Sequence, residues 1–198
     1  MKARSNNLYG LFVLMTTFSL FTGCAPQLTH ILNTREIPML QTGSPLIGIE
    51  SKIFAFNEFK DTRNISYVKQ IRNHTFVLDQ PPTNLIAMWI KKELERNGHV
   101  CITNASHVKA DFVVDGAILK YLSVGDGSWV ITSTSNIVVK LKISRIPFSL
   151  GVFEKSYEGE HRITGGGGDE WKISLQQALP ALIKEISTDD ELIKFIKK

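Results

Sequence analysis

Cysteine is scarce in this sequence, whose 198 residues contain two, Cys24 and Cys101. A framework of several disulfides within one chain is therefore excluded. Several catalytic and metal-binding patterns are also missing. The five histidines form neither a His-Glu-x-x-His nor a His-x-His pattern, and no Gly-x-Ser-x-Gly stretch occurs. Cys101 lies in an apolar context, so we expect it to be a small buried hydrophobic residue.

The sequence has no apolar run long enough to cross a bilayer comfortably. Residues Leu8–Phe21 are uncharged, but they fall short of the roughly 20 residues that a spanning helix needs. Lys2 and Arg4 precede this run, which is the pattern of a secretory signal. The stretch Leu20–Cys24 then ends in two small residues and a cysteine. It resembles the lipobox of bacterial lipoproteins, with Phe21 where leucine is usual.

We therefore expect a lipoprotein signal peptide over residues 1–23 and a lipidated Cys24. Several acyl chains anchor a protein stably, whereas one chain binds a membrane only marginally. The alternative is a buried or chance cysteine inside a plain signal or a single anchor helix. In bacterial lipoproteins an aspartate after the cysteine tends to retain the protein in the inner membrane. Ala25 therefore favours the outer membrane, and we expect an anchor on its periplasmic face.

Charge gives little support for nucleic-acid binding. The formal net charge is +4, and about two of these positive charges would leave with the signal peptide. Export argues further against a nucleic-acid partner. The remaining chain is long enough for one domain with a sizeable core. We expect residues 24–44 to form a polar tether and residues 45–198 to form a single α+β domain.

Alternating side chains predict a strand over residues 136–144, with one face buried and one in water. The inward set is Ile137, Val139, Leu141 and Ile143, and the outward set is Lys140, Lys142 and Ser144. Two neighbouring stretches also indicate strands. Residues 110–122 place Phe112, Val114, Ile118 and Leu122 on one face, and residues 151–163 place Glu154, Glu158 and Glu160 outward.

Helical spacing appears before and after these strands. Residues 83–97 carry apolar side chains four apart, and Gly98 supplies a left-handed end. The C-terminus repeats the pattern, with Pro180 predicting a kink or a boundary. Thr188 and Glu191 match a capping box that opens a last short helix. This order predicts an α+β fold, an antiparallel-dominated sheet with helices packed on one face and a C-terminal helical pair.

Five stretches together resemble the YajG family of bacterial lipoproteins in order and spacing. They are Phe59–Arg63, Leu85–Ile102, Ala110–Val124, Asn136–Ser144 and Leu175–Lys198. The best match is the joint between two helices at Ser187 and Asp189. The resemblance covers nearly all of the chain after the signal, and it implies an envelope lipoprotein without an assigned reaction. The glycine run Gly165–Gly168 departs from the family.

Two features could carry chemistry. Asp61 and Arg63 could form an acid–cation site, but their spacing favours a turn with a structural salt bridge. Gly165–Gly168 could cradle a phosphate before a helix. No P-loop lysine follows it, and the acidic residues Asp169 and Glu170 would repel an anion. We therefore favour a hinge or a hairpin-to-helix loop there.

Two functional hypotheses follow. The favoured one is a non-enzymatic lipid-anchored protein that binds or supports other envelope components, as an accessory of assembly, transport or secretion. It needs no cofactor, metal or nucleic acid, and it has an envelope protein as partner. Trp129, after a glycine-rich turn, is a candidate contact for that partner or for lipid. The alternative is an envelope hydrolase or small-ligand-binding protein that uses Asp61, Arg63 and Gly165–Gly168.

Overall fold

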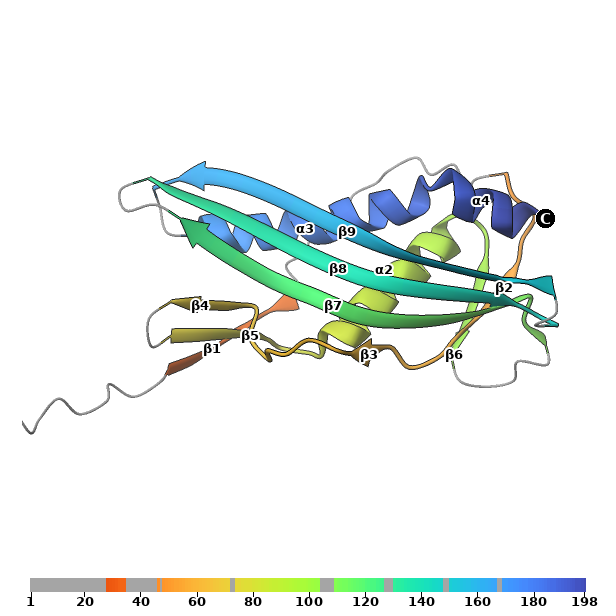
Figure 1. Ribbon diagram of the computed structural model, residues 1–198, viewed down its shortest axis with the longest axis horizontal. Helices are drawn as coiled ribbons and strands as arrows, with labels where there is room; N and C mark the ends of the chain where they lie inside the picture. The colour runs from red at the N-terminus through yellow and green to blue at the C-terminus, as the bar shows by residue number, and fades with distance from the viewer. Residues whose placement is uncertain are drawn as a thin grey trace, which may run out of the picture.

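A long antiparallel meander backed by helices forms the body of the protein in the computed structural model (Figure 1). The structure describes residues 28–34, 46, 48–71, 74–103, 109–126, 130–147, 150–166 and 169–198. Its strands are β1 (Leu28–Leu32), β2 (Ile53–Phe56), β3 (Lys60–Asp61), β4 (Lys69–Ile71), β5 (His74–Leu78), β6 (Val100–Thr103), β7 (Phe112–Asp126), β8 (Ile131–Arg145) and β9 (Val152–Gly165). Its helices are α2 (Pro82–Arg96), α3 (Glu170–Ser187) and α4 (Asp190–Lys197).

The larger of two sheets has the order β6-β2-β7-β8-β9, and β3 also pairs with β7. Strands β7, β8 and β9 run antiparallel, whereas β2 is parallel to both of its neighbours. A smaller sheet has the order β1-β5-β4, with β1 parallel to β5. The helices lie together behind the meander (Figure 1). The predicted α+β fold with helices on one face is therefore confirmed.

The inward face of β8 agrees with the sequence pattern. Its four predicted core residues, Ile137, Val139, Leu141 and Ile143, are buried. Lys140 and Lys142 face water, and Lys140 forms an exposed ion pair with Glu154 on β9. Ser144 was predicted to be exposed and is buried instead. Its cross-strand partner Val113 is buried too, so this end of the outer face is covered.

A bulge in β7 overturns part of the predicted face. The register between β7 and β8 shifts between Ile118 and Lys120, which leaves Leu119 as the extra residue. Because one inserted residue exchanges the two faces, Tyr121 takes the inward position after the bulge and is fully buried. The prediction that Leu122 shares the inward face is therefore wrong.

The helix boundaries agree in part with the sequence. Gly98 has a φ of 88° after α2, as its left-handed role requires. Helix α3 continues through Pro180, so of the two predicted outcomes, a kink or a boundary, the boundary is wrong. Residues on both sides of Pro180 are buried against the sheet, and this packing outweighs the cost of a proline in a helix.

The capping box was assigned to the wrong residue. Asp189, not Thr188, caps α4, because its carboxylate accepts a hydrogen bond from the backbone N–H of Glu191 at 2.9 Å. Thr188 instead ends α3, where its hydroxyl donates to the Lys184 carbonyl at 2.8 Å. The spacing in the sequence located the joint, but a neighbouring side chain performs the role.

Part of the expected tether belongs to the fold. Within residues 24–44, Leu28–Leu32 forms β1, which pairs with β5 from Leu28 opposite His74 to Leu32 opposite Leu78. The signal peptide and Cys24 lie outside the described residues. The first described strand therefore lies within the segment that was expected to be a tether.

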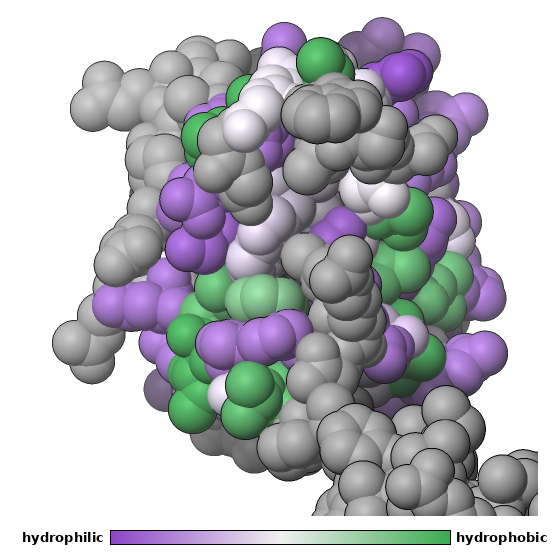
Figure 2. All heavy atoms as spheres, turned by 90° about the vertical axis from the view of Figure 1, so that its left-hand side faces the viewer, coloured by the Kyte–Doolittle hydropathy of each residue, from purple (hydrophilic) through white to green (hydrophobic). Residues whose placement is uncertain are grey.

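Large hydrophobic side chains are exposed mainly at the ends of the molecule. The described ones are Leu28, Ile31, Val100, Leu119, Val124, Val130, Leu150, Val152 and Ile173. Figure 2 shows the end that lies on the left of Figure 1, where hydrophobic residues form separate groups among hydrophilic ones. Among the described helices, none is long and apolar enough to cross a membrane.

Helix α3 packs unusually closely on β9 at Gly159. A Cβ atom at this position would lie 2.2 Å from the Ala178 carbonyl oxygen and 2.5 Å from the Leu182 Cβ. The first of these atoms belongs to the backbone of α3 and the second is attached directly to it. A side chain at Gly159 would therefore push the helix away from β9. The missing side chain sets the distance between helix and sheet.

Gly159→Ala is expected to lower stability by at least about 2 kcal/mol, because the added methyl group forces α3 off β9. Ser156→Ala, at an exposed position of the same strand, is the control and should change stability by less than about 0.5 kcal/mol. Urea unfolding of the chain from Cys24 onward measures both. Equal midpoints for the two variants would contradict the close contact.

Leu141→Asp is expected to be far more destructive than Lys142→Asp. Leu141 is 1 % exposed, and an unpaired carboxylate buried there costs at least about 3 kcal/mol. The urea midpoint of Leu141→Asp should fall by more than about 1 M relative to the wild type. Lys142 faces water, so its replacement should leave the midpoint nearly unchanged. Similar midpoints would show that the strand register is shifted by one residue.

Candidate functional site

Asp61 and Arg63 form a closed pair at the end of β3. The Arg63 guanidinium donates to both carboxylate oxygens of Asp61, from Nε to Oδ1 at 2.8 Å and from Nη2 to Oδ2 at 2.7 Å. The backbone N–H of Arg63 donates to Oδ1 as well, at 3.2 Å. Its Nη1 reaches the Tyr121 carbonyl on β7 at 3.4 Å. The pair therefore ties the chain after β3 to the meander.

Burial determines what this pair can do. The Arg63 side chain is only 4 % exposed, whereas Asp61 is partly open to solvent. The hydrogen bonds from Arg63 hold the pKa of the Asp61 carboxyl below its ordinary value. Burial raises the pKa of the Tyr121 phenol, which the Arg63 charge opposes. A carboxylate and a guanidinium that satisfy each other in this way are poor candidates for binding a charged substrate.

An open hollow of about 400 Å³ lies beside this pair. It is lined by Asp61, Arg63, Ser66, Val68, Val77, Leu78, Asp79, Gln80, Pro81 and Pro82. A larger open groove of about 550 Å³ runs along α2, where Lys91 donates a hydrogen bond to the Thr103 hydroxyl at 2.8 Å. Neither hollow includes the described part of the glycine run.

Gly165, the first residue of the glycine run, lies far from Asp61 and Arg63. Gly165 ends β9 beside the start of α3, and Gly167 and Gly168 lie outside the described residues. Arg63 contacts β7 at Tyr121, and the β7 end nearest the glycines is about 17 Å farther along, at roughly 3.4 Å per residue. A Cβ at Gly165 would lie 2.4 Å from a Glu170 carboxylate oxygen, so an acidic side chain occupies the space beside it.

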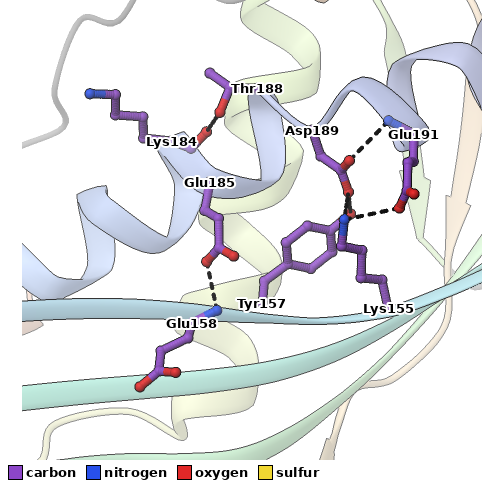
Figure 3. Close-up of polar contacts among 8 residues, drawn as sticks. All are labelled: Lys155, Tyr157, Glu158, Lys184, Glu185, Thr188, Asp189 and Glu191. Carbon is purple, nitrogen blue, oxygen red and sulfur yellow. Dashed lines mark hydrogen bonds and ion pairs between the residues drawn. The ribbon is translucent and has the colours of Figure 1, made fainter.

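The joint between α3 and α4 is a second polar cluster, drawn in Figure 3. Asp189 connects the two helices to β9. One carboxylate oxygen accepts from the Glu191 N–H, and the other accepts from the Tyr157 hydroxyl at 2.7 Å. Lys155 lies between two acids, with Nζ at 3.1 Å from both Asp189 and Glu191. Glu185 reaches the same strand, accepting from the Glu158 N–H at 2.7 Å.

Electrostatics at this joint favour a structural role. Burial works against an ionised Asp189, but hydrogen bonds from Tyr157 and Lys155 outweigh it and hold the pKa of this carboxyl below its ordinary value. Burial, followed by the hydrogen bond to Asp189, raises the pKa of the Tyr157 phenol. An ionised acid facing a protonated tyrosine holds helix and strand together, and leaves neither group free to transfer a proton at neutral pH.

The remaining chemical candidates are unreactive or isolated. Burial raises the pKa of the Cys101 thiol to about 12, and its Sγ lies 3.7 Å from the Lys91 carbonyl oxygen. A thiol with so high a pKa is a poor nucleophile. Among the residues that the structure describes, no three histidines, cysteines or acids gather closely enough to hold a metal ion.

No protein-family model matches the chain, and no curated protein matches it either. The chain shares the fold of a solved bacterial protein. The Xanthomonas campestris protein XCC0632, assigned to the family DUF330, has a TM-score of 0.61 at 12% identity, over 83% of this chain and 96% of that one. This similarity shows the fold alone.

Two weaker similarities have TM-scores below 0.5 and carry no argument. Protein CT253 from Chlamydia trachomatis has a TM-score of 0.48 at 12% identity, covering 74% of this chain and 98% of that one. Lipoprotein GNA1162 from Neisseria meningitidis has a TM-score of 0.38 at 9% identity, covering 57% and 83%. The resemblance to the YajG family is not shown by these comparisons and stays a prediction.

The sequence-based site residues therefore fall into three groups. Asp61 and Arg63 meet in a local salt bridge. The glycine run stands apart from them, and Trp129 lies outside the described residues, as does Cys24. The sequence did not indicate Tyr157 and Lys155 as partners of Asp189. The strand pattern places both residues on the inward face of β9. Their common partner Asp189 lies 32 residues after Tyr157, too far for a local pattern to indicate the contact.

Asp189→Asn is expected to lower stability at pH 7 by about 2 kcal/mol, because it weakens the helix cap and the charged contacts to β9. The folded pKa of Asp189 is lowered. Its contribution is therefore present above the unfolded pKa of about 4, and it is lost as pH falls through the folded value. Urea unfolding should show that the variant is less stable than the wild type at pH 7 and that this difference in unfolding free energy becomes smaller at pH 3.

Glu191→Gln is the matched control for this joint. Glu191 touches Lys155 but is 71 % exposed, so its loss should cost less than about 0.5 kcal/mol. A deficit for Asp189→Asn that stays constant between the two pH values would contradict the assigned charge state.

Proposed function

We propose that the protein is a non-enzymatic lipoprotein, anchored through acylated Cys24 to the periplasmic face of the outer membrane, that binds or supports another envelope component. The observation that carries the proposal is that Asp61 and Arg63, the residues that the enzymatic alternative would use, make structural contacts instead. Arg63 is buried against Asp61, and Gly165 ends β9, two strands away from the β7 strand that Arg63 contacts. The position of the anchor rests on the signal-like run before Cys24.

The surface for a partner is the outer face of the meander, opposite the helices (Figure 1). Lys140 and Lys142 on β8 stand beside the outward acids of β9. Glu154 pairs with Lys140, whereas Glu158 and Glu160 both approach the Asn136 amide nitrogen. A sheet face with ordered charges of both signs suits a partner of complementary charge, because such pairs set specificity and register.

The β9 edge of the sheet is partly covered by α3. Glu185 accepts the hydrogen bond of the outward Glu158 N–H, so α3 occupies part of the β9 edge. An edge that is covered in this way resists pairing with another strand. The face of the meander is therefore a better candidate for binding a partner than the β9 edge.

Cys24→Ala is expected to abolish acylation and to release the protein from membranes or leave its precursor unprocessed. Cells grown with a fatty-acid analogue report the label, and fractionation reports the location. Cys101→Ala is the control, because this half-buried thiol lies within the folded domain. Equal label in the wild type and in Cys24→Ala would exclude the lipid anchor.

The binding role is tested by photo-crosslinking in intact envelopes. A photoreactive residue at Lys142, on the outer face of the meander, should capture an envelope protein. The same residue at exposed Lys184, on α3, is the control. Capture at Lys184 alone, or at neither position, would contradict a partner on the sheet face.

A further inference from the structure

The start of the fold lies very close to the proposed anchor. Strand β1 begins at Leu28, four residues after Cys24. Four residues span at most about 14 Å when fully extended. If Cys24 carries acyl chains, as the proposed function requires, β1 therefore lies near the lipid headgroups.

Aromatic contacts fix β1 to the body of the protein. The ring of His30 stacks on Phe76 of β5 with centroids 4.7 Å apart, and Phe76 in turn lies 4.6 Å from Trp171 at the start of α3. His30 Nε2 and His74 Nδ1 share a hydrogen bond of 2.8 Å. Five residue pairs and this stack therefore hold β1 in place against β5.

The end of the molecule that carries β1 also carries exposed hydrophobic residues. Strand β7 ends there, β8 begins there and α3 begins there (Figure 1). The residues concerned are Leu28 (46 % exposed), Ile31 (72 %), Val124 (55 %), Val130 (60 %) and Ile173 (44 %). They are five of the nine exposed large hydrophobic residues that the structure describes. Figure 2 looks at this end directly.

Charge at this end does not oppose contact with lipid. Lys172, next to Ile173, is paired with Asp169 at 3.2 Å. Four of the apolar residues lie on β1, β7 and α3, and Val130 lies just before β8. Hydrophobic groups among hydrophilic ones, as Figure 2 shows here, suit a protein that rests in the interfacial layer without crossing it. Single apolar side chains inserted among headgroups need no continuous hydrophobic patch, since neighbouring polar groups stay hydrated there.

We propose that this end of the protein, led by Leu28 and Ile31 on β1, rests directly on the phospholipid surface. The occupant of these exposed positions is the headgroup and upper acyl layer of the membrane that holds the anchor. The inference rests on the proposed lipid anchor and adds an orientation to it. The meander then points away from the membrane, with α4 and the start of β9 at its far end (Figure 1).

The test places an environment-sensitive fluorophore at Ile31→Cys in the lipidated full chain, within a Cys101→Ser background. Val152→Cys is the matched control, because Val152 is 51 % exposed on a strand that begins at the opposite end. Each protein is reconstituted into vesicles of phosphatidylethanolamine and phosphatidylglycerol, with and without a lipid-borne doxyl quencher.

The label at Ile31 should shift to the blue and lose about half of its emission to the quencher, as expected for a side chain at interfacial depth. The label at Val152 should lose almost none. High salt should leave the quenching unchanged, because the contact is apolar.

Vesicle flotation separates this inference from the proposed function. A protein that floats with vesicles but shows no more quenching at Ile31 than at Val152 overturns the membrane contact and leaves the anchor standing. A chain that does not float overturns both. A third outcome also overturns the contact: a blue shift at Ile31 that grows with protein density while the lipid quencher leaves the emission unchanged. This result would indicate that a second copy pairs along β1.

Discussion

The close contact between α3 and β9 is the constraint on which the rest of the architecture depends. Because Gly159 has no side chain, the α3 backbone lies against the strand, and Glu185 can reach the outward N–H of Glu158. At the end of the same helix, Asp189 accepts from Tyr157 and starts α4. A helix held at both points covers one face of the meander and part of its edge. The position of α3 therefore decides which face of the meander is covered by helices and which face carries the exposed lysines of β8.

The sequence was sufficient wherever the determining contacts are local. The alternation in β8 needs only a period of two, and the Asp61–Arg63 pair needs only a turn, so both features could be predicted from neighbouring residues. The face of β7 beyond Ile118 could not, because the bulge at Leu119 is set by pairing with β8. The cap at Asp189 was missed for a similar reason. Thr188 and Asp189 are both good caps in isolation, and the contact with Tyr157 from β9 favours the second.

Strand β1 shows the limit most clearly. Its five residues have no strong pattern, and proline-rich polar sequence surrounds them. What makes them a strand is parallel pairing with β5, from residues 46 positions later in the chain. Such a partner leaves no signal in a local window, because a parallel pair needs a long connection between its strands. The arrangement of the candidate site could not be predicted for the same reason. Asp61, Arg63 and the glycine run each looked chemically plausible, and only the tertiary structure shows that Arg63 contacts β7 whereas Gly165 ends β9, two strands away.

The salt bridge of Asp61 and Arg63 also has a structural role. Arg63 crosses from the end of β3 to the Tyr121 carbonyl of β7, next to the bulge that reverses the strand's faces. The bulge interrupts the regular ladder, and β3 itself pairs with β7 over two residues. A buried arginine without its acid would be an uncompensated charge at this weak point of the sheet. The Asp61 carboxylate therefore compensates the charge of Arg63, and both residues line the open hollow beside β3.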